Sequence, residues 1–471
     1  MWFFSPSFDS ATSHSTNYYD LLGQGFLRGK PYLWLEPDPR LAELENPYSP
    51  SELGSIPVLH DATYFRGRYY LYFGPLPGAI AAAVRAITGV GIGDDWLTFA
   101  GIAGLFLASA DVLARISRMS YSHLPQWVIL PGLAVAGLAS PMLWILNYPA
   151  YNSAAVACGA FFLMAGLATA LSSLASVRHR RLRWLLASTF WSFAAASRII
   201  SAPAVIVFSL AMAIPATRER ALPTRARILG LTALTLPLAV TAGLLALYNI
   251  VRFGDPLETG LRYQMAGTDY TSFDRPFSAS YVAFNAYNYM WMPPRMGARF
   301  PFLHARSGTR KPPLLSPAPS SMHDPEQVTG LLLTTPFLLF AGYTVARAVC
   351  GVRPCADHVA VDAQARSLPE RRLAAHLSRT LLVAALSLFA PLLLFFYVSM
   401  RYLLDLSPML AVVASVGSWI AMEDHRDDGR LRRLVELLAI LSALVSVVFG
   451  VLLALSDSPA LAMILRARTG R

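Results

Sequence analysis

The sequence predicts an all-α fold: a polytopic transmembrane helical bundle of about ten spans. Of its 471 residues, 55% are hydrophobic and only 14% are charged, and the mean hydropathy is +0.45. Soluble domains carry about a quarter charged residues. The charges also disappear over successive windows of about 20 residues, which is the length that a helix needs to cross a bilayer. These observations together exclude a soluble or a disordered chain.

The apolar segments give the spans in order. The segment 184–215 is expected to form a pair of short helices with a break at Ser197-Arg198 and Pro203. The segment from Pro75 to Val90 is expected to be a short helix that lies along or dips into the membrane. The candidate spans are 96–117, 125–146, 151–174, 184–215, 228–251, 328–349, 379–399, 403–422 and 433–456.

Arginines fix the predicted orientation, because cytoplasmic loops are enriched in Lys and Arg. One alternating set of loops is rich in arginine, whereas the short loops of the other set hold only Arg198 and Arg401. The arginine-rich set is therefore expected in the cytoplasm. The arginines of this set are Arg115, Arg118, Arg178, Arg180, Arg181, Arg183, Arg218, Arg220, Arg225, Arg227, Arg347, Arg353, Arg366, Arg371, Arg372, Arg379, Arg426, Arg430, Arg432 and Arg433.

This topology divides the chain into five regions. An outer-face start would leave a hydrophilic head with no anchor, so we expect one more helix upstream, of which Trp2-Phe3-Phe4 is the trailing end. The regions are 1–95, a first extracytoplasmic loop with juxtamembrane helices; 96–252, transmembrane helices; 253–327, a second extracytoplasmic loop; 328–457, the C-terminal transmembrane helices; and 458–471, a tail.

Several function classes are excluded by composition and motifs. Topology explains the net charge of +11, so no nucleic-acid partner is expected. Cys158, Cys350 and Cys355 give no disulfide framework and no zinc-ligand spacing. The chain contains no phosphate-binding loop, no nucleophile elbow and no zinc-protease motif. Any chemistry is expected in the loops of the outer face, where charges serve no topological purpose.

The polar opening, from Met1 to about Pro77, interleaves acidic residues with Tyr and Trp. Carboxylates accept hydroxyl hydrogen bonds and aromatic rings stack on sugar C–H faces, so this composition suits a carbohydrate site. The alternative is a solvated loop whose aromatic side chains lie at the lipid headgroups. Asp9 or Asp20 could instead cap a short helix in this stretch.

Two further clusters lie at the predicted outer ends of spans. Gly254 and Pro256 end a helix and place Arg252 and Glu258 at the membrane edge, where a guanidinium can bind a phosphate bidentately. An Arg252–Glu258 ion pair is the alternative.

The second of these clusters is Met400–Pro408. Arg401 can bind a phosphate there, or it can extend to anionic headgroups or pair with Asp405. Arg198 is a weaker companion, since it can pair with an acid.

These stretches resemble the GT-C superfamily of polytopic glycosyltransferases. The matching residues are Phe8-Asp9 and segments 17–29, 60–64 and 69–77, the string 248–260 with Tyr263-Gln264, and the Arg401-Tyr402 to Pro408 turn. Oligosaccharyltransferases, protein O-mannosyltransferases and lipid A aminoarabinose transferases are examples of the superfamily. Asp9 is followed by Ser10, whereas the family often has Asp-Glu or Glu-x-Asp at this place.

The resemblance implies a glycosyltransferase that moves a sugar from a polyprenyl-phosphate donor to a glycan, lipid or protein acceptor. The expected place is the extracytoplasmic side of a bacterial inner membrane. The resemblance implies no certain cofactor: a divalent cation, Mg²⁺ or Mn²⁺, could be held by Asp9 and Asp61, and some members of the superfamily need none. The implied catalytic residues are Asp9 and Asp61; the donor-phosphate residues are Arg401, Arg252 and Arg198; the substrate-binding residues are Asp20, Tyr19, Tyr64, Glu258, Tyr263, Tyr402 and Asp405.

The alternatives are a polytopic transporter or flippase and a lipid-linked glycan ligase. Transporters place charges near the bilayer midplane on broken helices and often have repeated halves. Here midspan charges are scarce and no repeat is evident. A ligase would share the outer-face arginines, so only a substrate assay separates it from a transferase.

Overall fold

The structure is a computed structural model that describes residues 17–175, 179–218, 223–272, 276–313, 318–319, 322–350, 361–458 and 461. It is mostly helical, with a few two- and three-residue strands. The α-helices are α1 (Tyr18–Leu27), α2 (Pro50–Leu53), α3 (Leu76–Thr88), α4 (Asp94–Ser120), α5 (Ile129–Leu138), α6 (Tyr151–Ala175), α7 (Arg180–Ser197), α8 (Ala202–Arg218), α9 (Thr224–Phe253), α10 (Val282–Ala286), α11 (Leu331–Thr334), α12 (Phe340–Cys350), α13 (Val361–Leu394), α14 (Ser407–Asp424) and α15 (Gly429–Ser456).

Shorter elements join these helices. The 3₁₀ turns are η2 (Pro39–Ala42), η3 (Gln126–Val128), η4 (Trp144–Asn147), η5 (Ile199–Ser201), η6 (Leu261–Tyr263), η7 (Tyr270–Ser272), η8 (Ala279–Tyr281), η10 (Pro336–Leu339) and η11 (Met400–Asp405), and η9 (Tyr287–Trp291) is a π-helical turn. The strands form three antiparallel pairs: β1 (Thr63–Phe65) with β2 (Arg68–Tyr70), β3 (Arg295–Met296) with β4 (Leu303–His304), and β5 (Arg306–Ser307) with β6 (Gln327–Val328).

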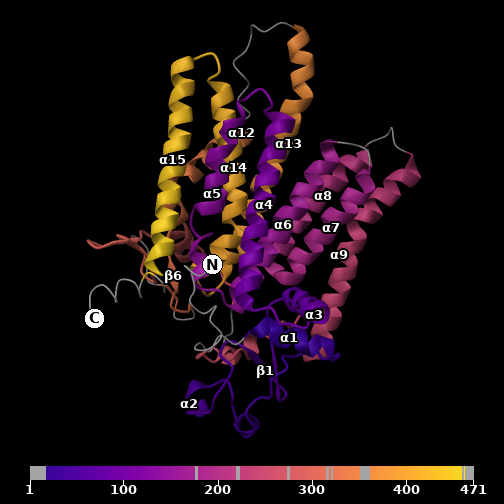
Figure 1. The fold of residues 1–471 in the computed structure, drawn as a ribbon, viewed down its shortest axis with the longest axis vertical. Coiled ribbons are helices and arrows are strands. Elements are labelled where there is room, and N and C mark those ends of the chain that lie inside the picture. Colours follow the sequence, from indigo (N-terminus) through magenta and orange to yellow (C-terminus); the bar gives the residue numbers. More distant parts are fainter. Residues whose placement is uncertain are drawn as a thin grey trace.

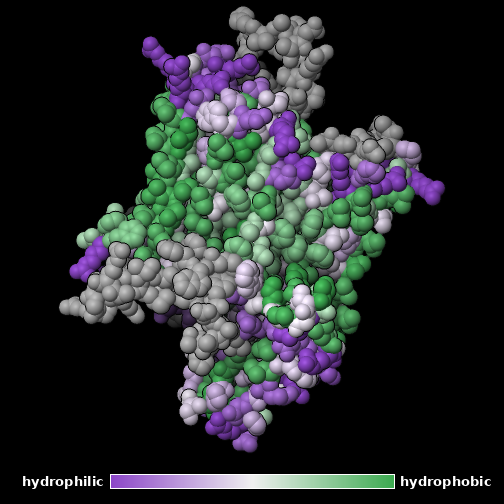
Figure 2. Space-filling model, viewed as in Figure 1, coloured by the Kyte–Doolittle hydropathy of each residue, from purple (hydrophilic) through white to green (hydrophobic). Residues whose placement is uncertain are grey.

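Five of the described helices are long and apolar enough to cross a membrane: α4, α6, α9, the 375–394 part of α13, and α15. They indicate an integral membrane protein. Figure 2 shows a broad apolar band between two polar ends of the molecule. Helix α9 lies mostly outside the protein core, with Leu236, Leu244 and Leu247 exposed, as expected for a helix that faces lipid.

The helices run side by side, and their connections alternate between two ends of the bundle (Figure 1). We call the end that carries α1, α3 and β1 the loop end. The α14–α15 turn lies at the opposite end, with Arg426 and Arg430 beside it. The side of the membrane that each end faces stays a prediction.

Prolines break the helices in several predicted spans. The break predicted at Arg198 is confirmed, since α7 ends at Ser197 and α8 begins at Ala202. The continuous spans predicted for 125–146 and 328–349 are wrong: α5 ends before Pro141, and Pro336 separates α11 from the helices that follow. Proline lacks an N–H group and disfavours helical backbone at the residue before it, which explains both interruptions.

The polar opening is anchored to the bundle through helix α1. The Asp94 carboxylate at the start of α4 accepts the backbone N–H groups of Tyr18 and Tyr19, at 2.9 and 3.0 Å. It therefore caps α1 from a neighbouring helix. Asp20 binds Arg85 of α3 at 2.6 Å, and this ion pair joins α1 to the predicted short helix, which the structure confirms.

A β-hairpin ties the polar opening to the second loop. Arg66 and Gly67 form its turn, both with positive φ, as a tight hairpin turn requires. Thr63 of β1 pairs with Gln264, and the Ala62 carbonyl accepts the N–H of Met265 at 2.9 Å. Met265 is buried with Tyr19, Leu22 and other residues of the polar opening in a small hydrophobic core separate from that of the bundle. Residues 17–75 and 254–265 therefore pack against each other at the loop end.

Close packing of α1 on α3 gives a test of this arrangement. A Cβ added at Gly23 would lie 2.8 Å from the Ala82 backbone nitrogen, whereas a Cβ at Gly243 in α9 meets nothing within 4 Å. We expect Gly23→Ala to lower the melting temperature in detergent because the two backbones must separate. The matched Gly243→Ala should leave it unchanged or raise it, since Ala favours a helix by about 0.5–1 kcal/mol over Gly. Equal effects of both variants would contradict the α1–α3 packing.

Candidate functional site

Asp61 is held in an unusual backbone conformation at the junction of three segments. Its φ is +61°, in the left-handed region that non-glycine residues rarely adopt. Its N–H donates to the Met265 carbonyl at 2.9 Å, and its carbonyl accepts the Tyr151 hydroxyl of α6 at 3.1 Å. Contacts from the second loop and from a spanning helix therefore hold this strained residue in place.

The Asp61 carboxylate is only partly used by its neighbours. Oδ1 accepts a hydrogen bond from Gln264 Nε2 at 3.2 Å and lies 3.6 Å from His60 Nε2. Within the described part of the chain, Oδ2 accepts no hydrogen bond. The Asp61 side chain is 27% exposed, so a ligand can reach it.

Arg401 is the cation of the same region. Its Nη2 donates to Glu326 Oε1 at 3.1 Å, and its Nε has no partner among the described residues. Burial and the nearby Glu326 carboxylate raise the pKa of Tyr397. Glu326 is positioned by the backbone, because its N–H donates to the Val398 carbonyl at 2.9 Å. With side-chain exposures of 19% for Arg401 and 37% for Glu326, an anion could compete for this guanidinium.

Tyrosines connect Asp61 to Arg401. The Tyr151 hydroxyl donates to the Asp61 carbonyl, and the Tyr151 ring lies 5.7 Å from the Phe73 ring. Phe73 and Tyr402 both lie against the Arg198 guanidinium, and Tyr402 also lies beside Arg401. Tyr72 and Tyr270 lie in the same region. Burial and the nearby Asp61 raise the pKa of Tyr270 to about 12, so its hydroxyl stays a neutral hydrogen-bond donor at pH 7. We call this group the acid–arginine cluster: Asp61, Tyr72, Tyr151, Tyr270, Glu326 and Arg401.

Arg198 and Asp405 form a sealed ion pair next to the acid–arginine cluster. Arg198 Nε donates to both Asp405 oxygens at 2.9 and 2.8 Å, and the side chains are only 4% and 2% exposed. Of the alternatives weighed from the sequence, Asp405 therefore pairs with Arg198 and not with Arg401. The Tyr402 ring lies near both guanidiniums, 4.9 Å from that of Arg198 and 5.6 Å from that of Arg401. Among these residues, Arg401 is the arginine that a ligand can reach.

Arg252 is buried at the end of α9. It donates to the Leu71 carbonyl and to Asn249 Oδ1, both at 2.6 Å, and its guanidinium lies 3.9 Å from the centre of the Tyr248 ring. The ion pair with Glu258 that the sequence offered as an alternative is wrong, because Glu258 binds Arg262 at 3.3 Å. Arg252 supports the backbone next to Tyr72 and is 5% exposed, so its contacts favour a structural role.

The other predicted residues have mainly structural partners. Asp20 binds Arg85, Tyr19 is fully buried, and Tyr64 packs edge-on against Tyr69. Tyr263 stacks in a tilted arrangement on Phe65, with 4.8 Å between the ring centres, and accepts a hydrogen bond from Arg262. Asp9 lies outside the described residues. Of the predicted set, the structure brings together Asp61, Arg401, Tyr402, Arg198 and Asp405.

Sequence reasoning missed several members of this region. Glu326 belongs to no motif, Tyr72 lies within the matching segment 69–77 but was not singled out there, and Tyr270 is one tyrosine among 20. Tyr151 begins a spanning helix, where an aromatic residue is expected at a membrane interface in any case. Their positions follow only from folding three chain-distant segments together.

The predicted divalent cation finds few ligands in the described residues. No group of three or more His, Cys, Asp or Glu side chains there could hold a metal ion. His60 and Asp61 lie close to each other but supply two ligands at most. The described residues alone therefore do not fit a metal site.

Comparison with known proteins gives a weak structural likeness. No protein-family model matches the chain, and no curated protein matches it. The fold is similar to the oligosaccharyltransferase of Archaeoglobus fulgidus in its apo form, with 13% identity and a TM-score of 0.42, over 94% of this chain and 53% of that chain. The archaeal oligosaccharyltransferase from the same organism in complex with an inhibitory peptide and a dolichol-phosphate gives the same identity and TM-score, over 94% and 51%.

The chain thus spans about half the length of these structures. A likeness at this identity and TM-score does not assign a function, so the proposal below rests on the residues of this chain.

The sealed ion pair predicts a large loss of stability when one partner is removed. We expect Asp405→Ala to destabilise the fold by about 3–5 kcal/mol, because it leaves the Arg198 charge buried without a partner. The double variant Arg198→Met/Asp405→Leu should recover most of this loss. Asp324→Ala is the control, since Asp324 is 85% exposed and its pair with Arg310 should contribute little. Thermal unfolding in detergent measures all three, and similar melting temperatures for Asp405→Ala and Asp324→Ala would contradict the sealed pair.

Proposed function

We propose that the protein is a membrane glycosyltransferase that moves a sugar from a polyprenyl-phosphate donor to an acceptor hydroxyl or amide at the acid–arginine cluster. The observation that carries the proposal is that Asp61 and Arg401 lie in one region, linked through the contacts of Tyr151, Phe73, Arg198 and Tyr402. The Asp61 carboxylate can take a proton, and the Arg401 guanidinium can bind a phosphate. Both groups are partly exposed, and they lie at the loop end of a bundle with spanning helices.

Arg401 would hold the donor phosphate. A guanidinium has five N–H donors, and Glu326 takes only part of this capacity. The phosphate would replace the Glu326 carboxylate on Arg401, which exchanges one anionic partner for another. Arg198 is buried against the Tyr402 ring and is neutralised by Asp405. It would therefore position this ring and contact no substrate.

Asp61 would activate the acceptor. The free Oδ2 can accept the proton of an acceptor O–H or N–H group as that atom attacks the anomeric carbon. The new C–O or C–N bond forms while the bond from the anomeric carbon to the phosphate oxygen breaks. The phosphate leaves with the electron pair and is stabilised by Arg401, so no strong leaving-group acid is needed. A single displacement of this kind inverts the anomeric configuration.

Aromatic side chains beside Asp61 suit a sugar. Tyr151 and Phe73 are buried, whereas Tyr18, which stacks on Tyr151 with ring centres 4.5 Å apart, is partly exposed and is the ring of this group that a sugar would reach. Apolar ring faces next to hydroxyl and carboxylate groups bind the C–H faces and the hydroxyls of a carbohydrate. The extracytoplasmic face of a bacterial inner membrane and a glycan, lipid or protein acceptor remain part of this proposal, as does a contribution of Asp9 or of a Mg²⁺ or Mn²⁺ ion that it would help to bind.

Site variants test the proposal in membranes that contain the protein. We expect Asp61→Asn to lower transfer of label from a polyprenyl-phosphate-linked hexose by about 10²-fold or more, because the amide cannot take the proton. Arg401→Ala should lower it by a similar factor, and Arg401→Lys should recover only part, since an ammonium lacks the bidentate fork. Asp324→Asn is the matched control and should keep full activity.

Asp9→Asn separates the two candidate bases. Full activity of Asp61→Asn together with loss in Asp9→Asn would transfer the role of base to Asp9. Full activity of Arg401→Ala would overturn the proposed phosphate site. Movement of the labelled lipid between leaflets without transfer would favour a flippase.

A further inference from the structure

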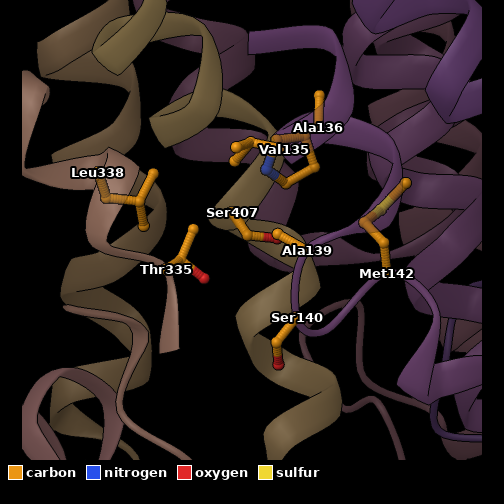
Figure 3. A pocket seen from close by; sticks show the side chains of 9 residues that line it. Val135, Ala136, Ala139, Ser140, Met142, Thr335, Leu338 and Ser407 are labelled. Atoms are coloured by element: carbon orange, nitrogen blue, oxygen red, sulfur yellow. The ribbon is translucent and has the colours of Figure 1, made fainter. Parts of the chain in front are cut away.

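A small hydroxyl-lined cavity lies at three helix breaks: one after α5, and two in the C-terminal half of the chain, after α11 and before α14. Ser140 follows α5, Thr335 follows α11, and Ser407 begins α14. Each of the three residues directly precedes a proline. All three residues line the cavity; in Figure 3, Ser407 lies between Thr335 and Ala139, and Ser140 lies below them.

All three hydroxyl groups are buried without a hydrogen-bond partner in the described part of the chain. The residues are exposed by only 3% for Ser140, 2% for Thr335 and 8% for Ser407. A buried polar group almost always has a partner, either from the protein or from an ordered water. Because three unpartnered hydroxyl groups line the same cavity, they indicate a bound molecule that supplies their hydrogen bonds.

The chemistry of the groups that line the cavity indicates which molecule fits there. The polar lining is neutral, consists of hydroxyl groups, and carries no carboxylate and no arginine; Leu338 and Val135 close the other sides. Each hydroxyl can donate and accept, so together they can give three hydrogen bonds to one small neutral molecule. The room at the centre is that of about one water molecule, and buried waters typically make about three hydrogen bonds.

We propose that this cavity binds a structural water that joins the breaks after α5, after α11 and before α14. Proline removes a backbone donor at each break, so these segments cannot be joined there by helical hydrogen bonds. The water would supply the missing connection. Ser407 also lies two residues after Asp405, so the water would support the start of α14 directly behind η11.

The sign of a stability change distinguishes a filled cavity from a dry one. Thr335→Val keeps the side-chain shape and removes one hydrogen bond to the water, so we expect the melting temperature in detergent to fall by about 2 °C or more. Ser407→Ala should act in the same direction. If the cavity is dry, both substitutions remove an unsatisfied buried hydroxyl and should raise the melting temperature or leave it unchanged.

Ser109→Ala is the matched control. Ser109 of α4 is fully buried and unpartnered but does not line the cavity, so its removal should be neutral or stabilising. If Thr335→Val and Ser407→Ala behave like Ser109→Ala, the proposal is overturned.

Direct observation gives a second readout that does not depend on the variants' stability. A high-resolution cryo-electron microscopy map of the full chain should show a density peak within hydrogen-bond distance of the three hydroxyls. Absence of the peak would overturn the proposal. Melting measured in sodium chloride and in choline chloride should give equal values; a loss of stability without sodium in the natural chain but not in Thr335→Val would show that the occupant is a cation.

Discussion

The ion pair between Arg198 and Asp405 is the interaction on which the arrangement at the loop end depends. It joins the break between α7 and α8 to the turn η11, more than 200 residues later in the chain, in a place closed to solvent. Two charges in such a place are tolerated only when each satisfies the other. The pair therefore fixes η11, and with it the positions of Tyr402 and Arg401.

The end of the polar opening packs against this same break between α7 and α8. Gly74 packs directly on the Ala196 carbonyl, at a distance that leaves no room for a side chain, and the Phe73 ring lies 5.6 Å from the Arg198 guanidinium. Tyr72 packs against Phe73 and so lies in the same region as Tyr402 and Arg401 of η11. One buried pair thus organises an acid from the start of the chain and a cation from its end around a common set of tyrosines. The buried Arg198 holds η11 in place, and the partly exposed Arg401 is the residue proposed to bind the phosphate.

Much of this could be predicted from the sequence, and the rest could not for physical reasons. Apolar segments of spanning length identified α4, α6, α9 and α15, and the lone arginines in short loops singled out Arg198 and Arg401. Sequence spacing does not reveal which acid meets which arginine. Asp405 is near Arg401 in the chain, but in the structure Asp405 forms its ion pair with Arg198. Arg401 forms its ion pair with Glu326. The break at Pro336 within 328–349 could not be predicted from composition, because this segment is as apolar as a continuous span.

The most direct test of the account is a structure of the protein in lipid nanodiscs with a polyprenyl phosphate. The account predicts phosphate density on the Arg401 guanidinium, with Glu326 displaced and Asp61 facing the phosphate across Tyr72. Phosphate density at Arg252 or elsewhere, with the Arg401–Glu326 pair intact, would contradict it.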